Sequence, residues 1–227
     1  MRLKTLLALL LACLLPVGCA PGVAVEKPKP AEFNKPSLMY SPGRKMVAEP
    51  KYPVKLGVLN VQDKRIVPFW YDADDFFAET ISAGLSANIY RDIRFSGIFS
   101  EVVRIPEPPP AMLTAENMLA LKNKYGVDMI LVTYVNEFYM SREKTGDIRM
   151  NTYILKIHAG LVSQLIYLQN GVVVWAEKVD RMQEDLTGQG VLSAGKTGEL
   201  ARQILRDAVG DMKTLMIQTG KVMRRAG

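Results

Sequence analysis

TYILKIHAGLVSQLIYLQNGVVVWAEKV, residues 152–179, is the stretch that decides the fold. Apolar and polar residues alternate along its first half, which is the period of a β-strand with one buried face. Leu155, Ile157, Ala159, Leu161 and Leu165 share one face, and Lys156, His158 and Gln164 share the other. Asn170-Gly171 is a strong signal for a tight hairpin turn, so Val172–Val179 is predicted to return as the next strand.

The segments upstream and downstream of this hairpin predict further strands and helices. Strands are expected at residues 54–61, 98–105 and 127–139. Helices are expected from an N-cap at Asp72 to Gly97, from a cap at Thr114 to Gly126, and over an amphipathic segment marked by Leu200, Ile204, Ala208, Met212 and Leu215. The order βαβαββα predicts a single α/β (α+β) domain over residues 53–227, with a mixed sheet covered by helices.

The N-terminus of the chain is basic and then apolar. Arg2 and Lys4 precede the apolar run Leu6–Leu15, which is too short to span a bilayer at about 20 residues per helix. This pattern predicts a removable signal peptide over residues 1–18. The only other cysteine, Cys13, lies in the apolar run, so Cys19 has no disulfide partner after cleavage.

Leu15-Pro16-Val17-Gly18-Cys19 resembles the lipobox of bacterial lipoproteins, in which the cysteine is lipidated and becomes the new N-terminus. Pro16 departs from the apolar residue usual at its position. The resemblance implies a palmitate-type lipid on Cys19, and Ala20 after it implies sorting to the outer membrane, with the domain facing the periplasm. The alternative is an ordinary signal peptide cut elsewhere.

The positive charge of the chain is concentrated before the predicted domain. The net charge is +6, and residues 1–52 contain eight Lys and Arg against three Glu. The remainder is close to neutral, which argues against nucleic-acid binding. Residues 19–52 are rich in proline and are predicted to be a lipidated, disordered tether, with its basic residues either solvated or close to anionic lipid.

Three short motifs of the predicted domain resemble a group of envelope proteins. Arg91-Asp92-Ile93-Arg94-Phe95-Ser96-Gly97-Ile98-Phe99 resembles a segment of the TolB N-terminal domain and of ABC-transporter auxiliary, CsgG-like and YajG-like lipoproteins. Tyr125–Val132 and Asn170–Trp175 resemble two further elements of that group. The resemblance implies the fold more than a function, because each motif is structural. The short, charged tip Ser141–Arg149 argues against a pore.

Gly190–Thr197 matches the pattern G-x-x-x-x-G-K-T of a phosphate-binding loop. Gly190, Gly195, Lys196 and Thr197 are its pattern residues. The polar stretch 178–189 before it is not a buried strand, and no later strand is expected to supply an acidic metal ligand, so a nucleotide site is not predicted. A glycine-rich loop that caps a helix, or a site for another anion, stays open.

Other signals of enzyme chemistry are weak. His158 is the sole histidine, and it is expected to be a surface residue without catalytic partners. A His/Cys metal site cannot be assembled, and Asp72, Asp74 and Asp75 are expected to cap a helix rather than hold a metal. We therefore expect a protein that is not an enzyme and has no cofactor beyond the lipid.

Phe69, Trp70 and Tyr71 are the candidate interaction residues, because large aromatic side chains in a loop anchor protein or lipid contacts. The alternative is that they fold back onto the sheet. These features predict an envelope lipoprotein that acts as an accessory or assembly subunit of a transport, secretion or polymer-assembly complex. A lipoprotein that binds a lipid or small ligand is the alternative, and a homo-oligomer is compatible with either.

Overall fold

A computed structural model describes residues 35–66, 76–111, 113–144, 152–188 and 194–225. Residues 34–227 form one compact unit. Cys19, the predicted signal peptide and the candidate aromatic residues Phe69, Trp70 and Tyr71 lie outside the described residues. Among the described residues, no helix is both long enough and apolar enough to cross a membrane.

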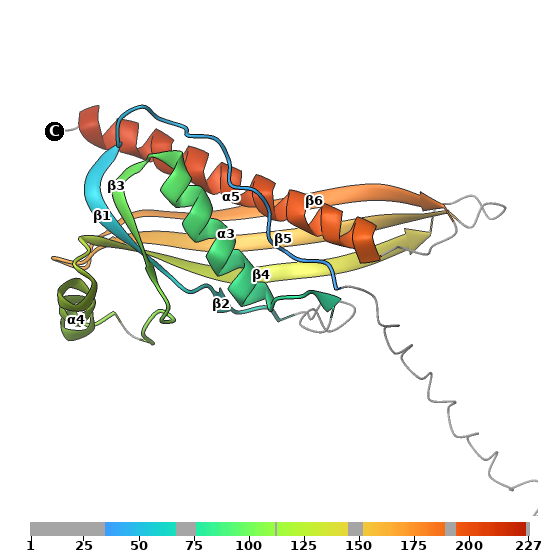
Figure 1. The fold of residues 1–227 in the computed structure, drawn as a ribbon, viewed down its shortest axis with the longest axis horizontal. Coiled ribbons are helices and arrows are strands. Elements are labelled where there is room, and N and C mark those ends of the chain that lie inside the picture. The colour runs from blue at the N-terminus through green and yellow to red at the C-terminus, as the bar shows by residue number, and fades with distance from the viewer. Residues whose placement is uncertain (1–34, 67–75, 112, 145–151, 189–193, 226–227) are drawn as a thin grey trace, which may run out of the picture. The chain divides into compact units, whose positions relative to one another are not determined.

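The unit is built on a six-stranded mixed sheet (Figure 1). The strands are β1 (Tyr52–Leu59), β2 (Gln62–Asp63), β3 (Phe99–Ile105), β4 (Met129–Lys144), β5 (Thr152–Tyr167) and β6 (Val173–Gly188). Their order is β3-β1-β4-β5-β6, with β2 paired to β4. Pairs involving β1 and β2 are parallel, whereas β4, β5 and β6 form an antiparallel meander. The predicted α/β class with a mixed sheet is confirmed.

The helices are α3 (Ile81–Ser96), α4 (Ala115–Tyr125) and α5 (Ala194–Arg225). The caps of α4 are those predicted, since Thr114 accepts a hydrogen bond from the Asn117 N–H and Gly126 ends the helix at a φ of 63°. The three strands predicted by residue range after α4 are present as β4, β5 and β6, although the order βαβαββα counted only two there, and the short β2 was not predicted.

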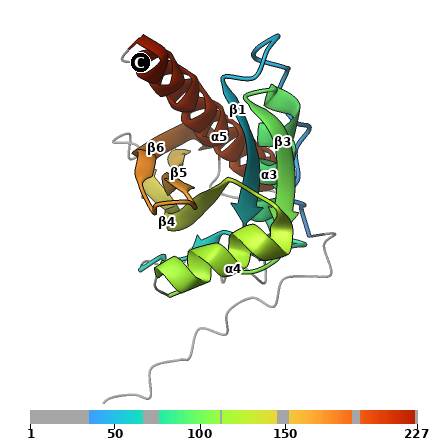
Figure 2. The same ribbon diagram turned by 90° about the vertical axis from the view of Figure 1, so that its left-hand side faces the viewer.

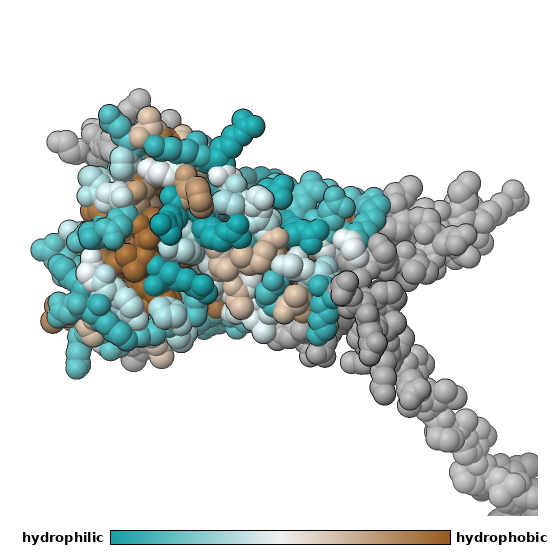
Figure 3. Space-filling model, in the orientation of Figure 1, coloured by the Kyte–Doolittle hydropathy of each residue, from teal (hydrophilic) through white to brown (hydrophobic). Residues whose placement is uncertain are grey.

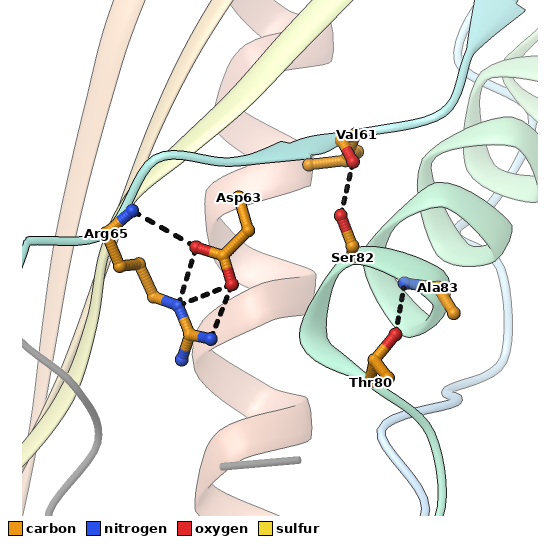
Figure 4. A network of polar contacts seen from close by, with 6 residues as sticks. All are labelled: Val61, Asp63, Arg65, Thr80, Ser82 and Ala83. Carbon is orange, nitrogen blue, oxygen red and sulfur yellow. Dashed lines mark hydrogen bonds and ion pairs between the residues drawn. The ribbon is translucent and has the colours of Figure 1, made fainter. Parts of the chain in front are cut away.

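The start of α3 differs from the prediction. The helix begins at Ile81, because Thr80 is its N-cap and accepts a hydrogen bond from the Ala83 N–H (Figure 4). In the same region the Ser82 hydroxyl donates to the Val61 carbonyl, which ties the helix to the chain before β2. The predicted capping residues Asp72, Asp74 and Asp75 lie outside the described residues.

The two faces of the sheet carry separate hydrophobic clusters. The larger one joins α3 and α5 to the sheet and contains the predicted stripe of β5, whose five members are each at most 1% exposed. The smaller one packs Met118 and Leu121 of α4 against the other face, through Ile130 and Val132 of β4. Figure 2 accordingly shows α4 on the side of the sheet opposite to α5.

Residues 35–50, which we call the strap, correct the predicted extent of the tether. The strap follows α3 from its start to its end (Figure 1). Leu38 is fully buried and Tyr40 is 5% exposed. The missing side chain of Gly84 makes room for Leu38, whose Cβ would lie only 3.0 Å from a Cβ at that position. The strap therefore belongs to the folded unit, because its apolar residues cover α3.

Polar side chains of α3 and of the residues just before it hold the backbone of the strap. The Leu38 N–H donates to Glu79, and the Asn88 amide donates to the Leu38 carbonyl at 2.9 Å. The Gly43 N–H donates to Asp92 Oδ1 at 2.6 Å. These side-chain contacts satisfy strap backbone groups that have no ladder partner.

Asp92, from the RDIRFSGIF motif, is buried beside a lysine of α5. Its Oδ1 accepts a hydrogen bond from Lys213 Nζ at 2.7 Å, and the two side chains are 1% and 5% exposed. The Tyr40 hydroxyl lies nearby, and burial, followed by the negative charge of Asp92, raises the pKa of Tyr40 well above its ordinary value. One buried ion pair thus joins α3, α5 and the strap.

Candidate interaction site

The half of the β4–β6 meander that is farther from the Asn170-Gly171 turn, which we call its far half, has one face that no helix covers among the described elements. Side chains on that face alternate with those of the larger core, which points the other way. Tyr139, His158 and Met182 stand directly opposite one another on adjacent strands. The rings of Tyr139 and His158 are stacked, with centroids 4.5 Å apart, and Met182 is 50% exposed. We call this row the central row.

Charged residues flank the central row on both sides. On one side, Lys156 lies 2.9 Å from Glu143 and 3.3 Å from Glu184. On the other side, Lys178 lies 3.5 Å from Glu137 and 3.0 Å from Asp180. Each lysine is shared by two carboxylates, so this part of the face is net acidic. The hydrogen bonds and charges of the paired carboxylates raise the pKa of both lysines.

Gly160, beside the central row, leaves room on this face for two acidic side chains. A Cβ at Gly160 would lie 2.9 Å from the Asp180 carboxylate and 3.0 Å from Glu137. The two acidic side chains therefore approach each other over a bare backbone. The result is an apolar and aromatic row with an excess of carboxylates on both sides, an arrangement suited to a partner surface.

The opposite side of the sheet is different in character. It carries α3 and α5, and hydrophilic residues are spread over it, while hydrophobic ones gather toward the end that holds β3 and α4 (Figure 3). His158 was expected to be a surface residue, and the structure places it half-buried against Tyr139.

The structure corrects the strand context of the glycine-rich loop. The polar residues 178–188 continue β6, which is an edge strand of the sheet. Among the described elements, β6 pairs with β5 and with no strand on its other side. They form a strand because α5 packs on one face of β6, while charged side chains suit its exposed positions. Gly190 lies outside the described residues, and Gly195 is in the first turn of α5.

The remaining pattern residues of that loop are engaged elsewhere. Lys196 Nζ lies 2.6 Å from Asp185 of β6, and Thr197 is 1% exposed. Since the lysine faces a carboxylate and the hydroxyl is buried, these two residues do not present a phosphate-binding arrangement. No group of three His, Cys, Asp or Glu side chains suited to a metal occurs in the described part of the chain.

Comparisons with known proteins bear on the fold. No family model matches the sequence, and no curated protein matches it. Protein XCC0632 from Xanthomonas campestris, of the family DUF330, has a similar structure, with a TM-score of 0.54 and 15% identity over 82% of this chain and 98% of that one. At this identity the likeness shows a shared fold alone.

Two looser likenesses have TM-scores below 0.5. The PelC dodecamer from Paraburkholderia phytofirmans has a TM-score of 0.38 and 14% identity over 74% of this chain and 92% of that one. The lipoprotein GNA1162 from Neisseria meningitidis has a TM-score of 0.37 and 15% identity over 68% of this chain and 97% of that one.

The sequence did not single out the central row. Tyr139 belonged to a predicted strand, and His158 to the polar face of another. Met182 joins them only because β6 extends past Val179 and pairs with β5 there. The bulge between Val135 and Glu137 also shifts the register of β4 against β5. Because β6 was predicted to end at Val179, its far half was not assigned to the sheet.

Proposed function

We propose that this protein is a non-enzymatic envelope lipoprotein that acts as an accessory or assembly subunit of a transport, secretion or polymer-assembly complex. The observation that carries the proposal is the central row, in which a half-exposed methionine adjoins a stacked aromatic pair on a sheet face without a described cover. Methionine and aromatic side chains are typical anchors of protein interfaces. The fold shared with XCC0632 is compatible with this role and does not specify it.

The chemistry of the face indicates the kind of partner. The central row favours an apolar or aromatic patch, and the surrounding carboxylates favour Arg or Lys around that patch. We propose a partner protein with a basic rim, at the outer membrane on its periplasmic side, where a lipid on Cys19 would hold this chain.

Site-specific photo-cross-linking in cells tests the proposal. A photoreactive residue replaces Met182 in the full chain, and the matched control replaces Leu119, a hydrophobic residue of α4 that is 56% exposed. We expect one dominant partner from position 182 and not from position 119. The same set of abundant proteins from both positions would refute the proposed interface.

The lipid anchor needs its own test. Metabolic labelling with a palmitate analogue should mark the wild-type chain, and Cys19→Ser should remove the label. Persistence of the label in Cys19→Ser would refute lipidation at that residue.

A second candidate function is the binding of a lipid or small ligand. An apolar pocket between helix and sheet would suit a lipid chain, but the larger core fills the described space between α3, α5 and the sheet. The observation that keeps this function open is a cavity lined mainly by charged residues, beside the strap.

A further inference from the structure

A cavity of about 490 Å³ lies between the strap, α3, β6 and α5. It is on the helix side of the sheet, so it is separate from the central row. Gly43 to Met46 form its strap wall, and the segment from Arg206 to Thr214 of α5 forms the wall across from them. Asp92 of α3 and Arg181 of β6 complete the lining.

Positive charge exceeds negative charge in this lining. The cations are Arg44, Lys45, Arg181, Arg206 and Lys213, and the carboxylates are Asp92, Asp207 and Asp211. Two of these carboxylates already form ion pairs within the lining, Asp92 with Lys213 and Asp211 with Arg181. The hydrogen bond and charge of Asp211 raise the pKa of Arg181, which stays protonated, and the Asp211 carboxylate compensates its positive charge.

The remaining cations are not neutralised in the same way. Arg44 and Lys45 form no ion pair with the described residues, and the Arg206 guanidinium lies over the Tyr40 ring, 5.5 Å from its centroid. Asp207 is the one lining carboxylate left to oppose them. A cavity whose walls hold three such cations has a local deficit of negative charge.

A buried lysine on the cavity wall provides the second observation. Lys213 is 4% exposed, and its ammonium group has three N–H donors. Asp92 Oδ1 accepts one of them, and a Cβ at Gly43 would lie only 2.8 Å from the same nitrogen. Because a buried ammonium is stabilised by further acceptors, this group favours an oxygen-rich ligand in the cavity.

We propose that this cavity binds an oxyanion, the phosphate or carboxylate group of a small ligand or of a lipid headgroup. Arg44 and Arg206 supply planar, permanently charged donors that suit such a group, and Lys213 supplies a donor from the floor. This inference deepens the second candidate function, the binding of a lipid or small ligand, and does not depend on the partner interface.

Gly210 offers a way to block the cavity without removing charge. It lines the cavity, and a Cβ at this position would meet no atom within 4 Å. A larger side chain there would occupy the cavity, and the helix would gain stability, since glycine is a poor helix former. Gly210→Leu is therefore a blocking variant that should fold.

The experiment titrates inorganic phosphate into the full chain carrying Cys19→Ser, so that no lipid anchor contributes. A second arm measures cosedimentation with phosphatidylglycerol vesicles against phosphatidylcholine vesicles. The test variants are Gly210→Leu and the double variant Arg44→Gln with Arg206→Gln. The control is Arg104→Gln, which removes an exposed arginine from β3 at the sheet edge opposite to β6.

We expect binding to weaken by about tenfold or more in both test variants and to be unchanged in the control. Binding of phosphate in solution would identify a small anion as the source, and binding of phosphatidylglycerol vesicles alone would identify a headgroup. Absence of binding in both arms, or binding that neither test variant weakens, would overturn the proposal. Cross-linking at position 182 reports on the partner interface separately.

Discussion

Leu38→Ala should lower the free energy of unfolding by about 2–5 kcal/mol, the range for a leucine removed from a packed core. Leu38 is fully buried, and its side chain fills the space that Gly84 leaves open on α3. In a unit of this size the loss corresponds to a fall in Tm of roughly 5–20 °C. Urea and thermal unfolding followed by circular dichroism of the full chain measure it.

Leu119→Ala is the matched control, because it makes the same chemical change at a side chain that is 56% exposed. It should change stability by less than about 0.5 kcal/mol. Trypsin cleavage at Arg44 and Lys45 reports on the strap itself and should accelerate in Leu38→Ala. Equal unfolding curves and equal cleavage rates for the two variants would show that the strap does not pack on α3, and the reasoning would fail.

Three further predictions concern single contacts. Lys213→Met should cost about 3–5 kcal/mol by leaving Asp92 buried without its partner, and adding Asp92→Leu should recover most of that loss in urea unfolding. Gly97→Ala should cost about 1–2 kcal/mol because φ is 73° there, and an undiminished Tm would contradict it. Burial acts to raise the pKa of Asp63, but hydrogen bonds and charge from Arg65 outweigh it and lower that pKa. The stability that this pair supplies is therefore present above the ordinary pKa of 3.8 and is lost as pH falls through the lower folded value. The gap in unfolding free energy between wild type and Arg65→Gln should narrow below about pH 4, and a gap independent of pH would refute the assignment.

The elements that could be predicted from the sequence are those with a strong local signal. The alternation in β5 and the Asn170-Gly171 turn fixed the hairpin, and Thr114 and Gly126 marked both ends of α4. Each signal acts within a few residues, so no knowledge of tertiary packing was needed.

The strap and the far half of β6 could not be predicted, because the residues that pack against them and hold them in place are distant in the sequence. Leu38 is buried only because α3 has a glycine at position 84 and polar side chains that form hydrogen bonds with the strap backbone. The charged residues after Val179 form a strand only because β5 lies beside them and α5 covers one face. In both cases tertiary context overrides composition.

The pairing within the candidate sites followed the same rule. Asp92 stood in a recognised motif, but the sequence places its partner Lys213 more than a hundred residues away. The central row and the cavity likewise gather residues from several elements. Single-residue reasoning found His158 and could not find the methionine and tyrosine that flank it.

The docked strap also sets a mechanical limit on a protein held by its N-terminus. If Cys19 is anchored in a membrane, the free length up to Lys35 is 16 residues, or at most about 55 Å fully extended. With the strap released the free length would reach Tyr52, and the limit would roughly double. A pull on the anchor would act first on Pro36, whose carbonyl accepts a hydrogen bond from the Ala78 N–H, and then on Ser37 and Leu38, from both of which Glu79 accepts hydrogen bonds. Tension would then detach the strap from the start of α3 toward its end. Detachment of the strap would therefore increase the distance that the domain can reach from its anchor.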